Sequence, residues 1–160
     1  MGKTPFSDDR AWTGIKHYCG YRERCHYEVR EKLFGMGLAK SKVEELICRL
    51  IADGFLNEER FARAFAGGHF RQKKWGRIKI IHALRQKRVS EPIIKLAMKE
   101  IEAIDYAASL QKLAAAKWRL LKKETFVNRQ AKTYSYLLQK GFEPMPVRQA
   151  IAALRMGNDA

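Results

Sequence analysis

The feature of this sequence that most constrains its fold is a set of apolar residues that recurs about every fifty positions. The first copy is Leu33, Leu38, Val43, Ile47 and Leu50. Adding 51 to each number, and then a further 53, gives two more sets, which are Leu84, Val89, Ile94, Met98, Ile101 and Leu137, Phe142, Val147, Ile151, Leu154. Apolar residues make up 46% of the chain, so chance would rarely fill all these positions. The sequence therefore predicts three tandem copies of one unit, and such units bury their apolar faces on one another.

Within each copy the apolar residues recur at helical spacing, and the pattern of three segments predicts three helices. Pro92, Pro144 and Pro146 fall where helices would begin, a place where proline is tolerated. We predict an all-α fold in which three tandem three-helix repeats form a curved, elongated array. The expected boundaries are a flexible N-terminal tail at residues 1–8 and repeats at 9–56, 57–104 and 105–160.

Two helix starts are indicated by capping residues. Asp53-Gly54 should end one helix, because glycine reaches the left-handed conformation that a helix end requires. Asn57 can then cap the next helix through its side-chain oxygen. Ser41, with Glu44 three residues later, resembles a capping box for an earlier helix.

Charge is unevenly distributed along the chain. The 32 basic and 17 acidic residues give a net charge of +15. Residues 16–60 hold 9 basic and 8 acidic side chains, whereas residues 61–160 hold 21 and 7. This excess favours nucleic acid, an acidic protein surface or an anionic membrane surface as partner. No apolar run is long enough to span a membrane, and the N-terminus lacks a signal-peptide core, so we expect a cytoplasmic protein.

The densest basic segment lies between Arg71 and Arg88, which contains eight Lys or Arg and no Asp or Glu. Such a segment repels itself unless an anion binds, although a solvated face is the simpler alternative. Phe70 and Trp75 flank the run and could stack on bases, although aromatic rings at helical spacing more often belong to a core. The candidate binding residues here are Arg63, Phe70, Arg71, Lys73, Lys74, Arg77, Lys79, Arg85, Lys87 and Arg88.

A second candidate surface lies on a predicted helix at residues 110–123. Its apolar face comprises Leu110, Leu113, Ala114, Trp118 and Leu121, and the opposite face carries Lys112, Arg119, Lys122 and Lys123. An amphipathic basic helix either binds an anionic partner or only keeps the protein soluble, and the sequence leaves both interpretations open.

Signatures of enzymes and metal sites are missing from the sequence. There is no phosphate-binding glycine loop and no zinc-protease motif. His17, Cys19, Cys25 and His26 are close together, but their spacing matches no common structural zinc site. We expect no catalytic residues, no cofactor and no metal, and three cysteines without a paired motif fit a reducing compartment.

The segment DGF-x-N-E-x-RFA at residues 53–62, followed by Arg71, Gly76-Arg77, Ile81 and Leu84, resembles the RecX family of RecA regulators. The resemblance covers roughly Ala11 to Leu154. It departs from the family pattern at Arg88, where a turn glycine is usual, and at Cys25, where serine is usual at a helix start. The resemblance implies a bent solenoid of three-helix units that binds RecA and its filament on single-stranded DNA and suppresses ATP hydrolysis and strand exchange.

The partners expected on this basis are RecA protein and its filament, together with single- and double-stranded DNA bound with little sequence preference. We expect a monomer and no membrane contact. The main alternative is a stand-alone DNA-binding module of helix-turn-helix type, which would need a recognition helix rich in base-reading side chains. A scaffold that binds only protein would show no affinity for DNA.

Overall fold

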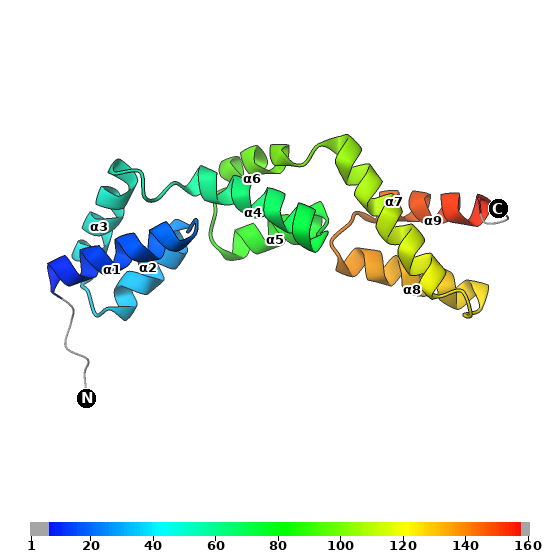
Figure 1. The fold of residues 1–160 in the computed structure, drawn as a ribbon, viewed down its shortest axis with the longest axis horizontal. Coiled ribbons are helices and arrows are strands. Elements are labelled where there is room, and N and C mark those ends of the chain that lie inside the picture. Colours follow the sequence, from blue (N-terminus) through cyan, green and yellow to red (C-terminus); the bar gives the residue numbers. More distant parts are fainter. Residues whose placement is uncertain (1–6, 158–160) are drawn as a thin grey trace, which may run out of the picture. The chain divides into compact units, whose positions relative to one another are not determined.

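The computed structural model describes residues 7–157, and the regular structure within that range is helical throughout (Figure 1). This confirms the predicted all-α class. No helix in this range is both long and apolar enough to cross a membrane. The elements in chain order are α1 (Asp8–Tyr21), α2 (His26–Gly35), α3 (Lys40–Ala52), α4 (Glu58–Lys73), α5 (Arg77–Gln86), α6 (Glu91–Ala97), the 3-10 helix η1 (Met98–Glu100), α7 (Ala103–Leu120), α8 (Phe126–Gln139) and α9 (Pro144–Met156).

Two compact units make up the described chain. Unit 1 comprises residues up to 64 together with 84–97, and unit 2 comprises 65–83 together with 98 onwards. Each unit therefore contains one complete set of three helices and part of α4 and α5. The predicted repeat boundaries at 9–56, 57–104 and 105–160 remain predictions.

The core of unit 1 is formed by the apolar faces of α1, α2 and α3, which pack together (Figure 1). Its buried residues include Ile15 of α1, Leu33 of α2 and Leu50 of α3. Leu56 closes the core after α3 has ended, because its N–H donates to the carbonyl of Leu50 at 3.2 Å and folds the chain back.

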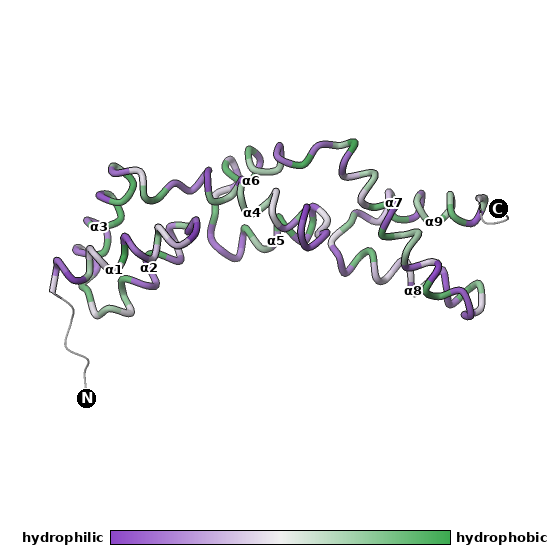
Figure 2. The backbone as a smooth tube through the Cα atoms, viewed as in Figure 1, coloured by the Kyte–Doolittle hydropathy of each residue, from purple (hydrophilic) through white to green (hydrophobic). Residues whose placement is uncertain are grey.

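The core of unit 2 is formed in part where α7, α8 and α9 each pack on the other two. Leu110 of α7, Leu137 of α8 and Ile151 of α9 are buried. Hydrophobic and hydrophilic segments alternate along these helices, as a one-sided apolar face requires (Figure 2). Pro144 stands in the first turn of α9, as expected for proline.

The recurring apolar positions are confirmed as core. Of the fifteen, the structure buries all but Leu38, Met98 and Leu154, which are half-buried. The turn geometry recurs in all three copies, since the N–H of Gly37 donates to the carbonyl of Phe34 at 2.9 Å, that of Arg88 to Arg85 at 2.9 Å and that of Gly141 to Leu138 at 3.0 Å. The spacings of 51 and 53 residues therefore relate equivalent positions in the three-dimensional structure.

One of the two predicted caps is confirmed. The Oδ1 of Asn57 accepts the N–H of Arg60 at 2.9 Å at the start of α4. The predicted capping box at Ser41 is wrong, because α3 already begins at Lys40 and Glu44 forms an ion pair with Arg30 at 2.9 Å instead. Of the predicted tail at 1–8, residues 1–6 lie outside the described residues, and α1 begins at Asp8.

Candidate functional site

The basic segment 71–88 folds as the last turn of α4, a short connection and α5. The expectation that its cations lack acidic partners is wrong, because the fold brings carboxylates to them from elsewhere in the chain. Arg85 forms an ion pair with Glu91 at 2.6 Å, and this hydrogen bond lowers the pKa of Glu91. Lys87 lies 3.5 Å from Glu28. Arg63, predicted alongside the run, lies 3.0 Å from Glu59.

Arg77 is also engaged by the protein itself. Its guanidinium lies 3.8 Å from the ring centre of Tyr106 and 3.6 Å from a carboxylate oxygen of Glu143. The Tyr106 hydroxyl accepts the N–H of Arg77 at 3.1 Å and donates to Glu143 at 2.5 Å. Burial, and then the hydrogen bond with Glu143, raise the pKa of Tyr106. Arg77 therefore holds the start of α5 against α7 and α9 and is not free for a partner.

Of the two aromatic residues considered for stacking on bases, Phe70 is not available for that role. Phe70 is only 6% exposed, and its ring centre lies 5.9 Å from that of Tyr106, within the apolar interior. Trp75, in contrast, is half-buried and lies between two lysines. Its ring centre is 4.5 Å from Nζ of Lys79 and 5.6 Å from Nζ of Lys73.

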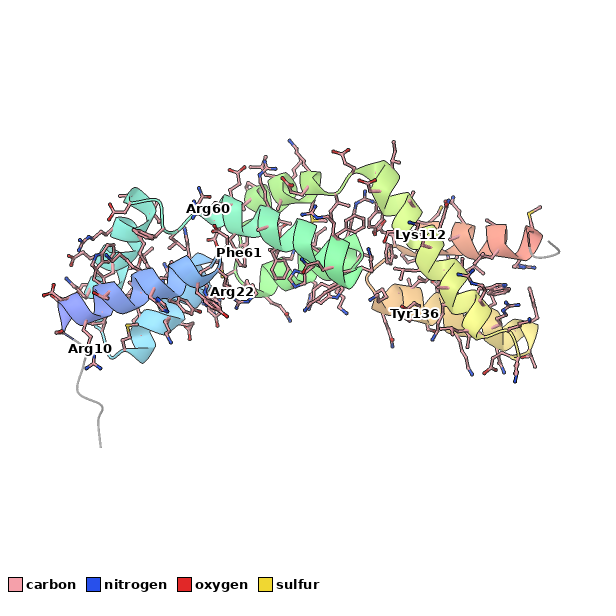
Figure 3. All side chains as sticks on the ribbon, viewed as in Figure 1. Arg10, Arg22, Arg60, Phe61, Lys112 and Tyr136 are labelled. Carbon is pink, nitrogen blue, oxygen red and sulfur yellow. The ribbon has the colours of Figure 1, made fainter. Side chains whose placement is uncertain are left out.

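Within unit 2, seven of the predicted cations are exposed, and no carboxylate within residues 7–157 pairs with any of them. We call them the open basic surface. All belong to unit 2. Lys112, on α7, is labelled in Figure 3. They comprise Arg71, Lys73 and Lys74 at the end of α4, and Lys112, Arg119, Lys122 and Lys123 on α7 and the turn that follows it.

The structure confirms the amphipathic character of the segment predicted at 110–123, although its bounds differ. The helix α7 begins earlier, at Ala103, and ends at Leu120. Leu110, Ala114 and Trp118 are buried, while the four basic side chains predicted opposite them are exposed.

The segment also ends α4 in an unusual way. Lys74 has φ 58°, the left-handed conformation, and the N–H of Trp75 donates to the carbonyl of His69 at 3.2 Å. This is the hydrogen bond of a helix-ending turn that glycine usually forms. Cations near the C-terminus of a helix interact favourably with the helix dipole. Arg71 and Lys73 therefore also stabilise the end of α4.

Cys19 and Cys25, near the N-terminus, are buried thiols. Within the described part of the chain, no three His, Cys, Asp or Glu side chains are placed to share an ion. Burial is the main reason why the pKa of Cys19 is raised to about 11 and that of Cys25 to about 12. The Sγ of Cys25 donates to Glu28 at 3.3 Å, which is a structural contact at the start of α2.

Two places where a helix start meets a turn from a later part of the sequence were not predicted. In unit 1 the start of α2, at Tyr27 and Glu28, meets the turn at Lys87 and Arg88, and we call this the first junction. The Lys87–Glu28 ion pair forms there, and the Arg88 guanidinium lies 4.5 Å from the ring centre of Tyr27. Arg88 has φ 59°, in a turn position that glycine fills elsewhere in the chain.

In unit 2 the start of α5 meets the turn at Lys140 and Gly141, and we call this the second junction. The N–H groups of Gly76 and Ile78 donate to the carbonyls of Lys140 and Gly141, at 2.7 and 3.0 Å. The Lys140 ammonium donates to the carbonyl of Lys73 at 2.8 Å. Sequence reasoning missed Lys140, although the spacing of 53 residues from Lys87 identified it as the equivalent position.

Comparison with known proteins agrees with this architecture. The model of the second three-helix domain of RecX matches residues 57–98, and that of the third matches residues 104–151. The regulatory protein RecX of Prosthecochloris aestuarii is 32% identical over 137 residues, covering 86% of this chain and 88% of that protein. The regulatory protein RecX of Chlorobium phaeobacteroides is 29% identical, covering 90% and 93%.

A solved structure has the same fold. The crystal structure of RecX from Lactobacillus salivarius superimposes with a TM-score of 0.83 at 21% identity, covering 93% of this chain and 97% of that one. The three-helix domains of the family models confirm the predicted tandem organisation. The domain matches and the extended sequence identity together show that this chain belongs to the RecX family of regulatory proteins.

Proposed function

We propose that this RecX-family protein regulates RecA by binding to the RecA filament on single-stranded DNA and inhibiting its ATP hydrolysis and strand exchange. The observation that supports this most directly is the open basic surface. Its seven exposed cations are of one sign and have no carboxylate partner within residues 7–157. Such a surface attracts a polyanion, and a nucleoprotein filament offers both phosphates and acidic protein groups.

The proposed mode of action is steric and electrostatic. Lysine and arginine on the open basic surface contact phosphates without reading sequence, so the protein should bind DNA with little sequence preference. Once bound, it occupies the filament where the next RecA subunit would add or where strand exchange would proceed. We propose that it acts as a monomer in the cytoplasm.

The alternative of a sequence-reading helix-turn-helix module is less well supported by the contacts of α5. A recognition helix reads bases with free Arg, Asn or Gln side chains. In α5 the residues so placed are Arg85 and Gln86, and Glu91 holds Arg85 at 2.6 Å. The open basic surface lies instead on α4, α7 and the turn after α7.

The test reverses three charges of the open basic surface and measures RecA activity. Lys112→Glu, Arg119→Glu and Lys123→Glu are combined in one variant. The matched control reverses three exposed lysines of unit 1 and has the same net charge, namely Lys32→Glu, Lys40→Glu and Lys95→Glu. Inhibition of RecA ATP hydrolysis on single-stranded DNA is titrated, and binding to DNA without RecA is measured by mobility shift.

We expect the α7 variant to need at least about tenfold more protein for half-inhibition, because several phosphate contacts are lost. The control should inhibit like the wild type. Equal loss in both variants would mean that net charge alone matters. A wild-type protein that binds DNA tightly but leaves RecA activity unchanged would refute the proposed regulation and favour the stand-alone module.

A further inference from the structure

The first and second junctions are built in the same way but differ in charge. Adding 51 to Glu28 gives Lys79, and adding 53 to Lys87 gives Lys140. In the first junction the two equivalent side chains form an ion pair at 3.5 Å. In the second junction both members are lysines, so the carboxylate that neutralises the first junction is replaced by a second cation.

Lys140 is held in a setting that disfavours its charge. The pKa of Lys140 is lowered, first because burial penalises the charged ammonium and second because the charge of Lys79 repels it. Lys73 adds a third cation, since its carbonyl accepts the Lys140 ammonium and its own ammonium lies 5.6 Å from the ring centre of Trp75. No carboxylate in the described range 7–157 pairs with these three lysines.

The backbone holds this cluster in place before any ligand arrives. The turn at Lys140 and Gly141 accepts two N–H groups from the start of α5, and Lys140 is tied to the end of α4. As a cation at the C-terminus of α4, Lys140 uses one of its three N–H donors in the hydrogen bond to the carbonyl of Lys73. The other two, together with the ammonium of Lys79 beside Trp75, remain for an external acceptor.

We propose that Lys79 and Lys140, with Lys73 beside them, form a binding site for a phosphate group of a nucleic-acid backbone at the second junction. Lysine ammonium groups are compact point charges with several donors, and they suit a phosphate approached from more than one side. The half-buried indole of Trp75 lies against Lys73 and Lys79 and limits where their ammonium groups can go. The site rests on the proposed contact with DNA but is independent of any action on RecA.

The test uses three single variants of the full chain. Lys140→Gln and Lys79→Glu alter the second junction, and Lys87→Gln alters the equivalent lysine of the first junction. Lys87→Gln should fold normally, because Glu28 keeps Arg22 and Arg24 at 3.6 and 3.5 Å. Lys79→Glu rebuilds at the second junction the acid–base pair of the first, so it should melt no lower than the wild type while presenting a carboxylate to the phosphate.

Binding of a fluorescent oligothymidylate of about thirty nucleotides is measured by anisotropy at several salt concentrations, with inorganic pyrophosphate as competitor in a parallel series. Lys140→Gln and Lys79→Glu should each weaken binding roughly tenfold at low salt. The slope of log affinity against log salt should become shallower by about 0.7, the value for one phosphate of a single strand. Lys87→Gln should match the wild type.

An unchanged salt slope in folded Lys140→Gln and Lys79→Glu, with the wild type binding normally, would overturn the site while leaving the proposed function in place. A loss of RecA inhibition in these variants with DNA binding intact would also overturn it, because the anion would then be a protein carboxylate. A wild type that binds no oligonucleotide would overturn both the site and the proposed DNA contact. Pyrophosphate competing at micromolar concentration would identify a small phosphate compound, and not DNA, as the ligand.

Discussion

Gly76 lies so close to Gly141 that it cannot carry a side chain, and Lys79 leaves no room for a side chain on Gly141. A Cβ on Gly76 would lie 2.3 Å from the carbonyl carbon and oxygen of Gly141, and a Cβ on Gly141 would lie 2.3 Å from the Cβ of Lys79. This contact lets two N–H groups at the start of α5 reach the carbonyls of the α8–α9 turn. It therefore determines the geometry of the second junction.

Replacing Gly76 by alanine should destabilise the protein by about 1–3 kcal/mol or more, because a methyl group would overlap backbone atoms that have little room to move. Gly68→Ala is the matched control. Gly68 lies inside α4 with nothing within 4 Å of its Cβ position. That substitution should stabilise by about 0.5–1 kcal/mol, as usual for a helix interior. Urea unfolding followed by circular dichroism measures both. Equal stability of Gly76→Ala and wild type would show that the junction opens readily.

Leu84 is fully buried at one of the recurring apolar positions. Leu84→Ala should cost about 2–5 kcal/mol through lost burial and the cavity left behind. Ile104, which is 84% exposed, gives the control, and Ile104→Ala should change stability by less than about 0.5 kcal/mol. Chemical denaturation would measure both changes. A cost below that level at Leu84 would contradict its assignment to the core.

Arg88 holds a left-handed backbone conformation that costs a side-chain-bearing residue about 1–2 kcal/mol. Arg88→Ala keeps that cost and loses the contact with Tyr27, which is worth about 0.5–1 kcal/mol. Arg88→Gly loses the contact but relieves the backbone. We therefore expect the glycine variant to be more stable than the alanine variant by about 1–2 kcal/mol in thermal unfolding. The reverse order would show that the turn has adapted to the arginine.

The three cysteines should differ sharply in reactivity. The thiolate is the reactive form, and burial raises the pKa of Cys19 to about 11 and of Cys25 to about 12. Cys48 is exposed on α3. At pH 8 an aromatic disulfide reagent should release one equivalent quickly from the native protein and all three after unfolding in urea. Substituting Cys48 by serine should abolish the fast phase, and three thiols reacting together in the native state would contradict the burial.

The sequence predicted the core well because the buried apolar residues recur at regular intervals along the chain. Leu84 and Ile151 could be assigned to the core from the sequence alone. The helical spacing of apolar residues and the length of each copy can both be counted along the chain. The exposure of Lys112 and Arg119, which belong to the open basic surface, was also predictable, because both lie opposite the apolar face of one helix. These features depend only on the spacing of residues along the chain.

The sequence did not predict which cations are neutralised by the protein itself. Arg77 meets Glu143 and Lys87 meets Glu28 only because a helix start packs on a turn from a later repeat. Phe70 was misassigned because hydropathy does not say whether a ring at the end of an apolar stripe faces the core. The sequence shows that Lys79 stands where the first copy has Glu28. The effect of this replacement on local charge could be inferred only after the structure had placed both residues in the junctions.

The two junctions make the repeats non-interchangeable. In the first junction the turn position is Arg88, whose side chain packs against Tyr27 beside Glu28. In the second junction the same turn position must be glycine, because a Cβ on Gly141 would overlap Lys79. A tandem duplication of the middle repeat would bring the Arg88 turn against Gly76 and Lys79, where it cannot fit. The order of the repeats is therefore fixed in part by these two turns, and a second copy of the middle repeat would need glycine in place of Arg88 to form the same contact.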